Sequence, residues 1–374
     1  MPSNGPLAGV RLIEMDAIGP VPLCGMILSG LGADVVRVAR PGGQPAFDDL
    51  GEAVLYRGRT TVEIDLKSEA GREALLTLVE QADGLIEGLR PGVMERLGLG
   101  PQVCLDRNPR LVYGRSTGWG QDGPGSRKAG HDINYISMTG ALHAIAQAGQ
   151  GPTVPLNLVG DYGGGTMFLA LGMVSAILAA RTTGKGQIVD AAIVDGVANL
   201  LGLFHAFLDT GTWQDTPATN VLDGASPFYR CYLCEDGGYV AVGPLEPQFF
   251  AQLLAGLGIP DGRFEQYNSD HWPEMERAFA LAFGGKPRRH WEELFADSDA
   301  CVTPVLSMRE AMTHPVNVAR GVFVSHGGVM QAAPAPRFSA TPGTIQAERT
   351  LDVGGVLDLW RDEAARPEAN PADR

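Results

Sequence analysis

The chain has 374 residues, of which 44% are hydrophobic and 19% charged, and this composition predicts a globular protein of roughly two domains. The formal net charge is −14 and no stretch is basic enough to hold a phosphate backbone, so we expect no nucleic acid partner. The five cysteines are scattered and odd in number, which argues against a disulfide framework and predicts a reducing, cytoplasmic compartment.

The first 120 residues alternate between short apolar strands and helices. We expect helices at 23–32, after a proline-rich turn, and at 68–82, where Ser68 can cap the first turn. Strands are expected at 10–15, 33–40, 60–67, 83–89 and 110–120. This alternation predicts an α/β fold with a Rossmann-like, doubly wound parallel sheet. The turn "DAIGPVPLCG" after the first strand lacks G-x-G-x-x-G, so nothing indicates a dinucleotide.

A long apolar run at 163–180 approaches the length of a membrane span. Three glycines occupy its first turn, and we interpret it as a buried core helix, with no membrane partner. The N-terminal "MPSNGPLAG" lacks a signal-peptide pattern and the C-terminal "NPADR" lacks a peroxisomal one, so we expect neither address.

In the second half of the chain the alternation of strands and helices ends. Hairpin-like strands are expected around 220–243 and helices from 246 to 300. The pair in "CYLC" lies on one of these strands without the further ligands of a zinc site. We expect a large domain at 1–185 completed by about 330–365, a linker helix at 186–221, a small α+β domain at 222–310 and a return linker at 311–330.

The stretch "AGHDINYIS" places His131 directly beside Asp132. A single histidine is more often a hydrogen-bonded structural residue than a catalytic one, and both interpretations stay open. The seven histidines are spread out with no H-x-x-x-H pair, so we expect no metal.

Asp161 precedes three glycines at the start of the apolar helix. It is equally well explained as a helix cap or as a site residue. The glycines would let a ligand approach the backbone, and the free N–H groups of a first turn suit an anion or a developing oxyanion. Apolar surroundings would raise the pKa of Asp161. Asn157, four residues earlier, could hydrogen-bond this carboxyl group.

Three arginines follow predicted strands, where ligands gather in sheets of this type. Arg90 follows the fourth strand, and Arg37 and Arg40 lie at the end of the second; an anion site and structural ion pairs are equally good explanations. Glu246 precedes a proline-started helix and has the pattern of a helix cap or of a first-turn acid. These patterns alone indicate an α/β enzyme with acid–base or acyl chemistry and an anionic ligand.

Several motifs in order are more specific, among them "GLGADVVRVARPGG", "STGWGQDGP", "AGHDINYISMTGAL" and "LVGDYGGGTMFLALG". Together they resemble the family III CoA-transferase (CaiB/BaiF) superfamily over about residues 7–345. Within it they resemble the α-methylacyl-CoA racemases, because His131 stands where transferases usually lack a histidine and "GPLEPQFF" replaces a mobile glycine-rich loop. Ala39 departs from the pattern, since many relatives have an acid there.

The resemblance implies an interlocked homodimer whose active site lies between the large domain of one chain and the small domain of its partner. It implies that His131 and Asp161 exchange a proton with opposite faces of the α-carbon of a 2-methylacyl-CoA. Glu246 would support His131 across the dimer, Asn157 would hold Asp161, and the enolate oxygen would lie on the backbone N–H of Asp161.

No metal or redox cofactor is implied, since CoA belongs to the substrate. The predicted CoA and substrate contacts are Arg37, Arg40 and Arg90 for the phosphates, with Gly118, Tyr135 and Gly163 along the rest of the ligand.

Two other functions remain open. In a family III CoA-transferase, Asp161 would be a nucleophile that forms an acyl anhydride, and His131 would be incidental. A silent CoA-binding protein would bind CoA without exchanging the α-proton. The acyl group is not defined: Met138, Met167 and Met173 could form an adaptable acyl surface or simply pack in the core.

Overall fold

The computed structural model describes residues 5–43 and 53–364, and these fall into two compact units. Unit 1 comprises the described residues of Met1–Thr139, Leu156–Leu200 and Gly321–Arg374, and unit 2 comprises Gly140–Pro155 and Leu201–Arg320. Within the segment expected as a linker at 186–221, a strand is followed by two helices that belong to different units. They are β6 (Gln187–Ala192), α9 (Ile193–Leu200) and α10 (Gly202–Asp209).

A seven-stranded sheet forms the centre of unit 1, with the order β12-β3-β2-β1-β4-β5-β6 and all neighbours parallel. Besides β6, its strands are β1 (Arg11–Met15), β2 (Asp34–Ala39), β3 (Thr60–Glu63), β4 (Gly84–Glu87), β5 (Val112–Thr117) and β12 (Arg349–Thr350). The predicted α/β fold with a doubly wound parallel sheet is therefore confirmed.

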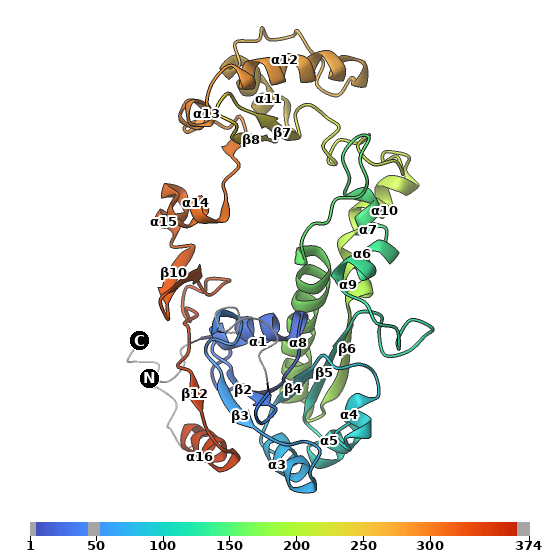
Figure 1. The fold of residues 1–374 in the computed structure, drawn as a ribbon, viewed down its shortest axis with the longest axis vertical. Helices are drawn as coiled ribbons and strands as arrows, with labels where there is room; N and C mark the ends of the chain where they lie inside the picture. The colour runs from blue at the N-terminus through green and yellow to red at the C-terminus, as the bar shows by residue number, and fades with distance from the viewer. Residues whose placement is uncertain (1–4, 44–52, 365–374) are drawn as a thin grey trace. The chain divides into compact units, whose positions relative to one another are not determined.

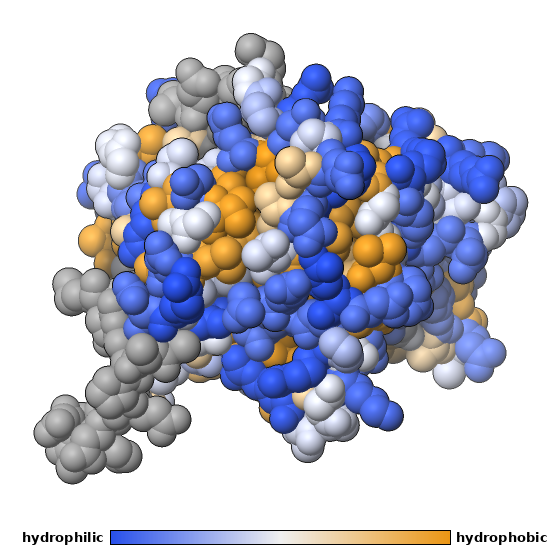
Figure 2. Space-filling view, turned by 90° about the horizontal axis from the view of Figure 1, so that it is seen from below, coloured by the Kyte–Doolittle hydropathy of each residue, from blue (hydrophilic) through white to orange (hydrophobic). Residues whose placement is uncertain are grey.

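Both faces of this sheet are buried, as is usual when helices connect parallel strands. Leu12 packs with α1 (Pro20–Gly30) and α8 (Met167–Thr183) on one face, whereas Ile13 packs on the other. That second face is covered by α3 (Glu69–Val79), α4 (Val93–Arg96), α5 (Pro101–Arg107) and α16 (Val353–Ala364) (Figure 1). Seen from below, where Figure 1 places α3, α5 and α16, hydrophilic residues cover much of the surface, and hydrophobic residues show between them (Figure 2).

Two helix starts illustrate how sequence sets these elements. The Ser68 hydroxyl accepts the N–H of Gly71 at 2.9 Å, so the predicted cap of α3 is confirmed. The other helix, α1, begins at Pro20, three residues before the expected start. The proline-rich turn is its first turn, because the first N–H groups of a helix need no partner within the helix and proline is tolerated there.

The long apolar helix is continuous from the π-helical turn η1 (Leu158–Thr166) into α8. By length and composition this segment could cross a membrane, and in the structure it packs across β5 and β6. Met173 is fully buried against Gly84 and Gly114, where an added Cβ would meet its side chain at 2.6 and 2.5 Å. Met173 is therefore a core residue, while Met138 and Met167 are exposed.

Unit 2 contains an antiparallel sheet packed on helices through an aromatic core that includes Phe228, Phe250, Phe279 and Phe283. The sheet comprises β7 (Arg230–Leu233), β8 (Tyr239–Val242) and β9 (Val302–Pro304). The helices that contribute to this core are α11 (Pro247–Gly256), α12 (Trp272–Gly284) and α13 (Arg288–Phe295). Unit 2 also contains α10 and the short helices α7 (Ala141–Ala144), η2 (Ser269–His271), α14 (Met308–Thr313) and α15 (Pro315–Arg320). A small hairpin of β10 (Phe323–His326) and β11 (Val329–Ala332) returns the chain to unit 1.

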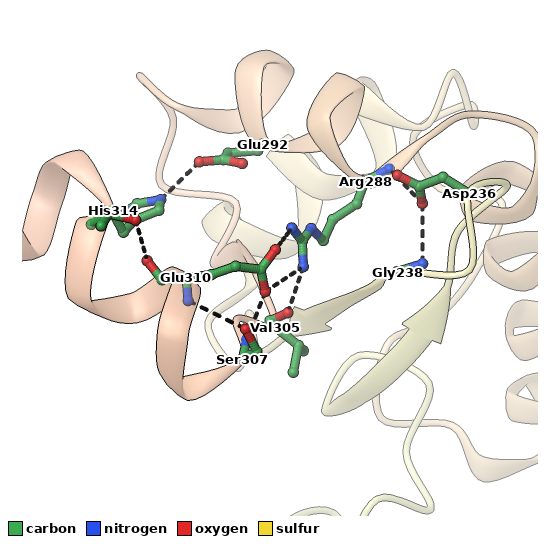
Figure 3. Close-up of polar contacts among 9 residues, drawn as sticks. Asp236, Gly238, Arg288, Glu292, Val305, Ser307, Glu310 and His314 are labelled. Atoms are coloured by element: carbon green, nitrogen blue, oxygen red, sulfur yellow. Dashed lines mark hydrogen bonds and ion pairs between the residues drawn. The ribbon is translucent and has the colours of Figure 1, made fainter.

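A polar network centred on Glu310 connects three parts of unit 2 (Figure 3). Glu310 pairs with the guanidinium of Arg288, which also donates to the Val305 carbonyl at 2.9 Å. Glu310 and Ser307 form a reciprocal capping box at the start of α14. The backbone N–H of Arg288 donates to Asp236 in the β7–β8 turn at 3.2 Å. Arg288 and the two groups of the capping box lower the pKa of Glu310 to about 2.

Candidate active site

A cavity of about 500 Å³ lies in unit 1 at the carboxyl ends of the central strands. Its walls are the loops that follow β1, β4 and β5, together with the starts of η1 and of α6 (Asp132–Met138). The carboxyl ends of parallel strands are the usual ligand site in such sheets. His131, Asn157 and Asp161 line this one cavity although 30 residues separate the histidine from the aspartate.

His131 is the N-cap residue of α6. Its backbone N–H donates to Oδ1 of Asn134 at 3.0 Å. This bond anchors the backbone of His131 while the imidazole lines the cavity and stays exposed. The ring is thus available to a ligand.

Asp161 lies in the π-helical turn, and its carboxyl group is partly buried at the cavity wall. Burial raises the pKa of Asp161, and the negative charge of Asp132 raises it further. Donation from Asn157, at 3.5 Å, and the proximity of His131 act in the opposite direction but do not cancel the rise. Asp161 can therefore hold a proton at a higher pH than an ordinary aspartate.

The backbone N–H of Asp161 already has an acceptor within the protein. It donates to Oδ2 of Asp132 at 2.7 Å. The expectation that this N–H would receive the enolate oxygen is therefore wrong for this structure. The reason is that first-turn N–H groups need an acceptor, and the buried Asp132 carboxylate on α6 supplies it.

The glycines after Asp161 serve packing rather than ligand approach. A Cβ at Gly164 would come within 2.6 Å of Val197 on α9, and one at Gly165 within 2.7 Å of Pro20 on α1. Gly163, predicted as a substrate contact, is not among the residues that line the cavity. Close approach of helices explains this run of small residues.

Gly19 is a site residue that the sequence analysis did not identify. Its φ of 76° lies in the left-handed region, and an added Cβ would lie 3.6 Å from Oδ2 of Asp161. Glycine at this position leaves the space above the carboxyl group open. The signal was present in the "GP" dipeptide after the first strand, but it was read only as a turn.

Tyr135 and Gly118 form one wall of the cavity. The Tyr135 hydroxyl donates to the Gly130 carbonyl, and its ring packs edge-to-face on Trp119 with centroids 4.9 Å apart. A Cβ at Gly118 would clash with this ring at 1.9 Å. Burial and the nearby Asp161 raise the pKa of Tyr135, so its hydroxyl stays protonated.

The predicted arginines divide into two groups. Arg90 lines the cavity, as does Lys128, which the sequence analysis did not single out. Arg37 pairs with Asp16 at 2.8 Å and lies 3.6 Å from the centre of the Tyr56 ring, and Arg40 is exposed after β2. Neither lines the cavity, so the structure brings only Arg90 of the three beside His131 and Asp161.

A buried ion pair anchors the start of the loop that carries Arg90. Glu87, at the end of β4, accepts the backbone N–H of Leu89 at 2.7 Å and pairs with Arg115 at 2.9 Å. Arg115 also pairs with Glu95 at 2.8 Å. These bonds fix the path of the chain through Arg90.

Glu246 belongs to unit 2, where it is the exposed N-cap residue of α11. Its backbone carbonyl accepts the N–H of Phe249 and Phe250, but its carboxylate makes no capping hydrogen bond. The interpretation of this side chain as a helix cap is therefore wrong, and the carboxylate is available for another role.

The fold and this cavity define an α/β protein with a histidine and a protonatable aspartate at the ends of parallel strands. The model of CoA-transferase family III matches residues 7–349, so the chain belongs to that family, and the resemblance is confirmed. The chain is 42% identical to an alpha-methylacyl-CoA racemase of Mus musculus and 40% identical to that of Homo sapiens, each over 93% of this chain and 90% of the relative.

Other relatives show the breadth of the family. An acetyl-CoA:oxalate CoA-transferase of Acetobacter aceti is 30% identical over 98% of this chain and 97% of its own length. The crystal structure of a CaiB/BaiF family protein from Brucella suis matches with a TM-score of 0.79 and 25% identity, covering 96% of this chain and all of the other.

Proposed function

We propose that the protein is a racemase that inverts the α-carbon of 2-methylacyl-CoA thioesters. In this reaction His131 and Asp161 exchange protons with opposite faces of that carbon. The observation that carries this proposal is that both side chains line one cavity and that the pKa of the carboxyl group is raised. The two racemases that are 42% and 40% identical to the chain support the same substrate class.

The chemistry needs one base and one acid on opposite faces of the substrate. Neutral His131 takes the α-proton of one enantiomer, the electrons move into the thioester carbonyl, and protonated Asp161 delivers its proton to the other face. In the reverse direction the Asp161 carboxylate takes the proton and the His131 imidazolium returns one. A carboxyl group with a raised pKa suits this alternation, because its protonated form is more accessible than that of an ordinary aspartate.

Cationic side chains near the cavity suit the phosphates of CoA. Arg90 and Lys128 line the cavity itself. Arg37 and Arg40, the other two phosphate contacts that the family resemblance predicts, do not line the cavity. CoA is part of the substrate, and the reaction requires no separate cofactor.

We further propose that the active molecule is an interlocked homodimer in the cytoplasm. One face of α8 carries four exposed apolar side chains at helical spacing, which suits coverage by a second chain. They are Met167, Leu171, Val174 and Leu178, with exposed fractions of 53, 64, 37 and 68%. In such a dimer Glu246 of the partner would orient His131, as carboxylates commonly do for catalytic histidines.

A CoA-transferase is the alternative function, supported by the 30% identical relative from Acetobacter aceti. In that reaction the Asp161 carboxylate would attack the thioester, form an acyl anhydride and release CoA as a thiolate. A raised pKa makes Asp161 less available as a carboxylate, which favours the racemase.

The test follows one pure enantiomer of 2-methylhexanoyl-CoA in D₂O by NMR, without any acceptor acid. We expect deuterium at the α-carbon together with the opposite enantiomer, and loss of the opposite enantiomer in His131→Ala by about 10²- to 10⁴-fold. His143→Ala is the matched control, because His143 is an exposed histidine of unit 2. Transfer of CoA to added carboxylates without α-exchange would show a transferase, and CoA binding with neither reaction would show a silent binding protein.

A further inference from the structure

Asp132 is a buried acid beside both proposed bases, and the proposed reaction gives it no step. Its exposed fraction is 5%, and it is the first residue of the helix that His131 caps. Its Oδ2 accepts the backbone N–H of Asp161 at 2.7 Å. One carboxylate therefore links the element that carries the histidine to the element that carries the aspartate.

The neighbouring residue Gly160 leaves space for the Asp132 carboxylate. A Cβ at Gly160 would come within 2.4 Å of Oδ2 and 3.0 Å of Ile136, so only glycine leaves room for the carboxylate at this point. Oδ1 is buried and has no hydrogen-bond partner among the described residues. A buried oxygen without a partner costs free energy, which a purely structural cap would not need to incur.

We propose that Asp132 is a positioning residue that holds the backbone of Asp161 against the start of α6 and so sets the spacing of the two bases. The inference rests on the proposed racemase function. Proton transfer to opposite faces of one carbon requires both groups within hydrogen-bond reach of it, and displacements of about 1 Å can cost about 100-fold in rate.

Asp132 also acts on Asp161 through its charge. After burial, it is the largest cause of the raised pKa of Asp161, whereas Asn157 and His131 lower that pKa. Among the described residues, Asp161 also interacts with Tyr135, whose raised pKa keeps it neutral. Geometry and charge can be separated, because asparagine keeps an oxygen acceptor without the charge and alanine removes both.

The experiment compares Asp132→Asn and Asp132→Ala with the wild type, using 2-methylhexanoyl-CoA in D₂O across pH. We expect Asp132→Ala to lower kcat by about 10- to 100-fold with little change in KM, because positioning and not CoA binding is lost. Asp132→Asn should recover most of kcat, while the limb of the pH profile that reports Asp161 moves to lower pH. Wild-type kcat and an unmoved limb in both variants would overturn the proposal.

A matched control and a second readout keep this test separate from the proposed function. Asp352→Asn changes a carboxylate that accepts the N–H of Gly355 at 2.7 Å at the start of α16, and should leave kcat unchanged. The carboxyl pKa of Asp161, followed by ¹³C NMR without substrate and assigned with Asp161→Asn, should fall in Asp132→Asn. If the wild type exchanges no α-proton, the racemase fails, yet this titration still decides whether Asp132 acts on Asp161; an unchanged pKa there counts against it.

Discussion

Asp161 in unit 1 and Glu310 in unit 2 are both acids at or near a helix start, yet their surroundings drive their pKa values in opposite directions. Glu310 pairs with Arg288 and takes part in a capping box, and these partners lower its pKa to about 2. Asp161 has one long contact with Asn157 and a second carboxylate beside it, and its pKa is raised.

The difference shows how to distinguish an acid that holds the fold from one that does chemistry. Partners that stabilise a carboxylate make it a fixed charge and remove its capacity to exchange protons near neutral pH. An acid left beside a cavity with its charge poorly supported can take and release a proton. Asp161 belongs to the second type and Glu310 to the first.

Replacing each acid by its amide tests this distinction most directly. We expect Asp161→Asn to lower interconversion of the enantiomers by about 10²- to 10⁴-fold in both directions, because inversion needs both bases, whereas His131 can still exchange the α-proton of the enantiomer that it deprotonates. The fold should persist, since the amide has the same shape and removes the repulsion with Asp132. Formation of the opposite enantiomer and entry of ²H at the α-carbon, each followed from either pure enantiomer in D₂O, are the measurements.

Glu310→Gln serves as the control for that experiment and should exchange the α-proton at the wild-type rate. If Asp161→Asn keeps interconversion of the enantiomers within about tenfold of the wild type, Asp161 is not one of the bases. Equal losses in both variants would show that the two acids do not differ as the comparison requires.

Glu14 in unit 1 extends the comparison, because it is a fully buried acid that, unlike Asp161, forms an ion pair with an arginine. Its Oε2 accepts Nε of Arg59 at 3.1 Å, and the exposed fractions of the two side chains are 0 and 1%. We expect Arg59→Met to lower the free energy of unfolding by about 3–5 kcal/mol, because a buried carboxylate loses its charge partner. Urea denaturation followed by circular dichroism measures this change.

The double variant Glu14→Leu, Arg59→Met is the matched control. It removes both charges and should recover most of the lost stability, as replacement of whole buried pairs often does. A loss of less than about 1 kcal/mol in Arg59→Met would mean that this pair behaves like an exposed one.

Much of the fold could be predicted from the sequence, because buried parallel strands appear as short apolar runs and helix caps depend on a few consecutive residues. The strand alternation predicted the sheet, and Ser68 predicted the start of α3. What failed were features decided by tertiary contacts. The break between α9 and α10 at Leu201 lies within one apolar run, and no proline interrupts it.

The site was only partly predictable for the same reason. His131 and Asp161 could be singled out because each has a distinctive neighbourhood in the sequence, and the structure places both on one cavity. The acceptor of the Asp161 N–H could not be predicted, because Asp132 reaches it from 29 residues away. The glycines after Asp161 were interpreted as ligand contacts, since the helices that pack against them are invisible in the local pattern.

The smallest expected effect is a difference in how the two acids couple stability to pH. The pKa of Glu310 falls from 4.5 to about 2 on folding, so its stabilising contribution is complete above pH 4.5 and is lost as the pH falls toward 2. Asp161 has the opposite sign: its raised pKa favours folding below 3.8, and that contribution is lost as the pH rises through the raised value. Thermal unfolding of Glu310→Gln should therefore show a lower Tm than the wild type at neutral pH and the same Tm near pH 2. The Tm of Asp161→Asn should equal that of the wild type at acidic pH and exceed it at neutral pH. Parallel Tm curves for both variants would contradict the opposite signs.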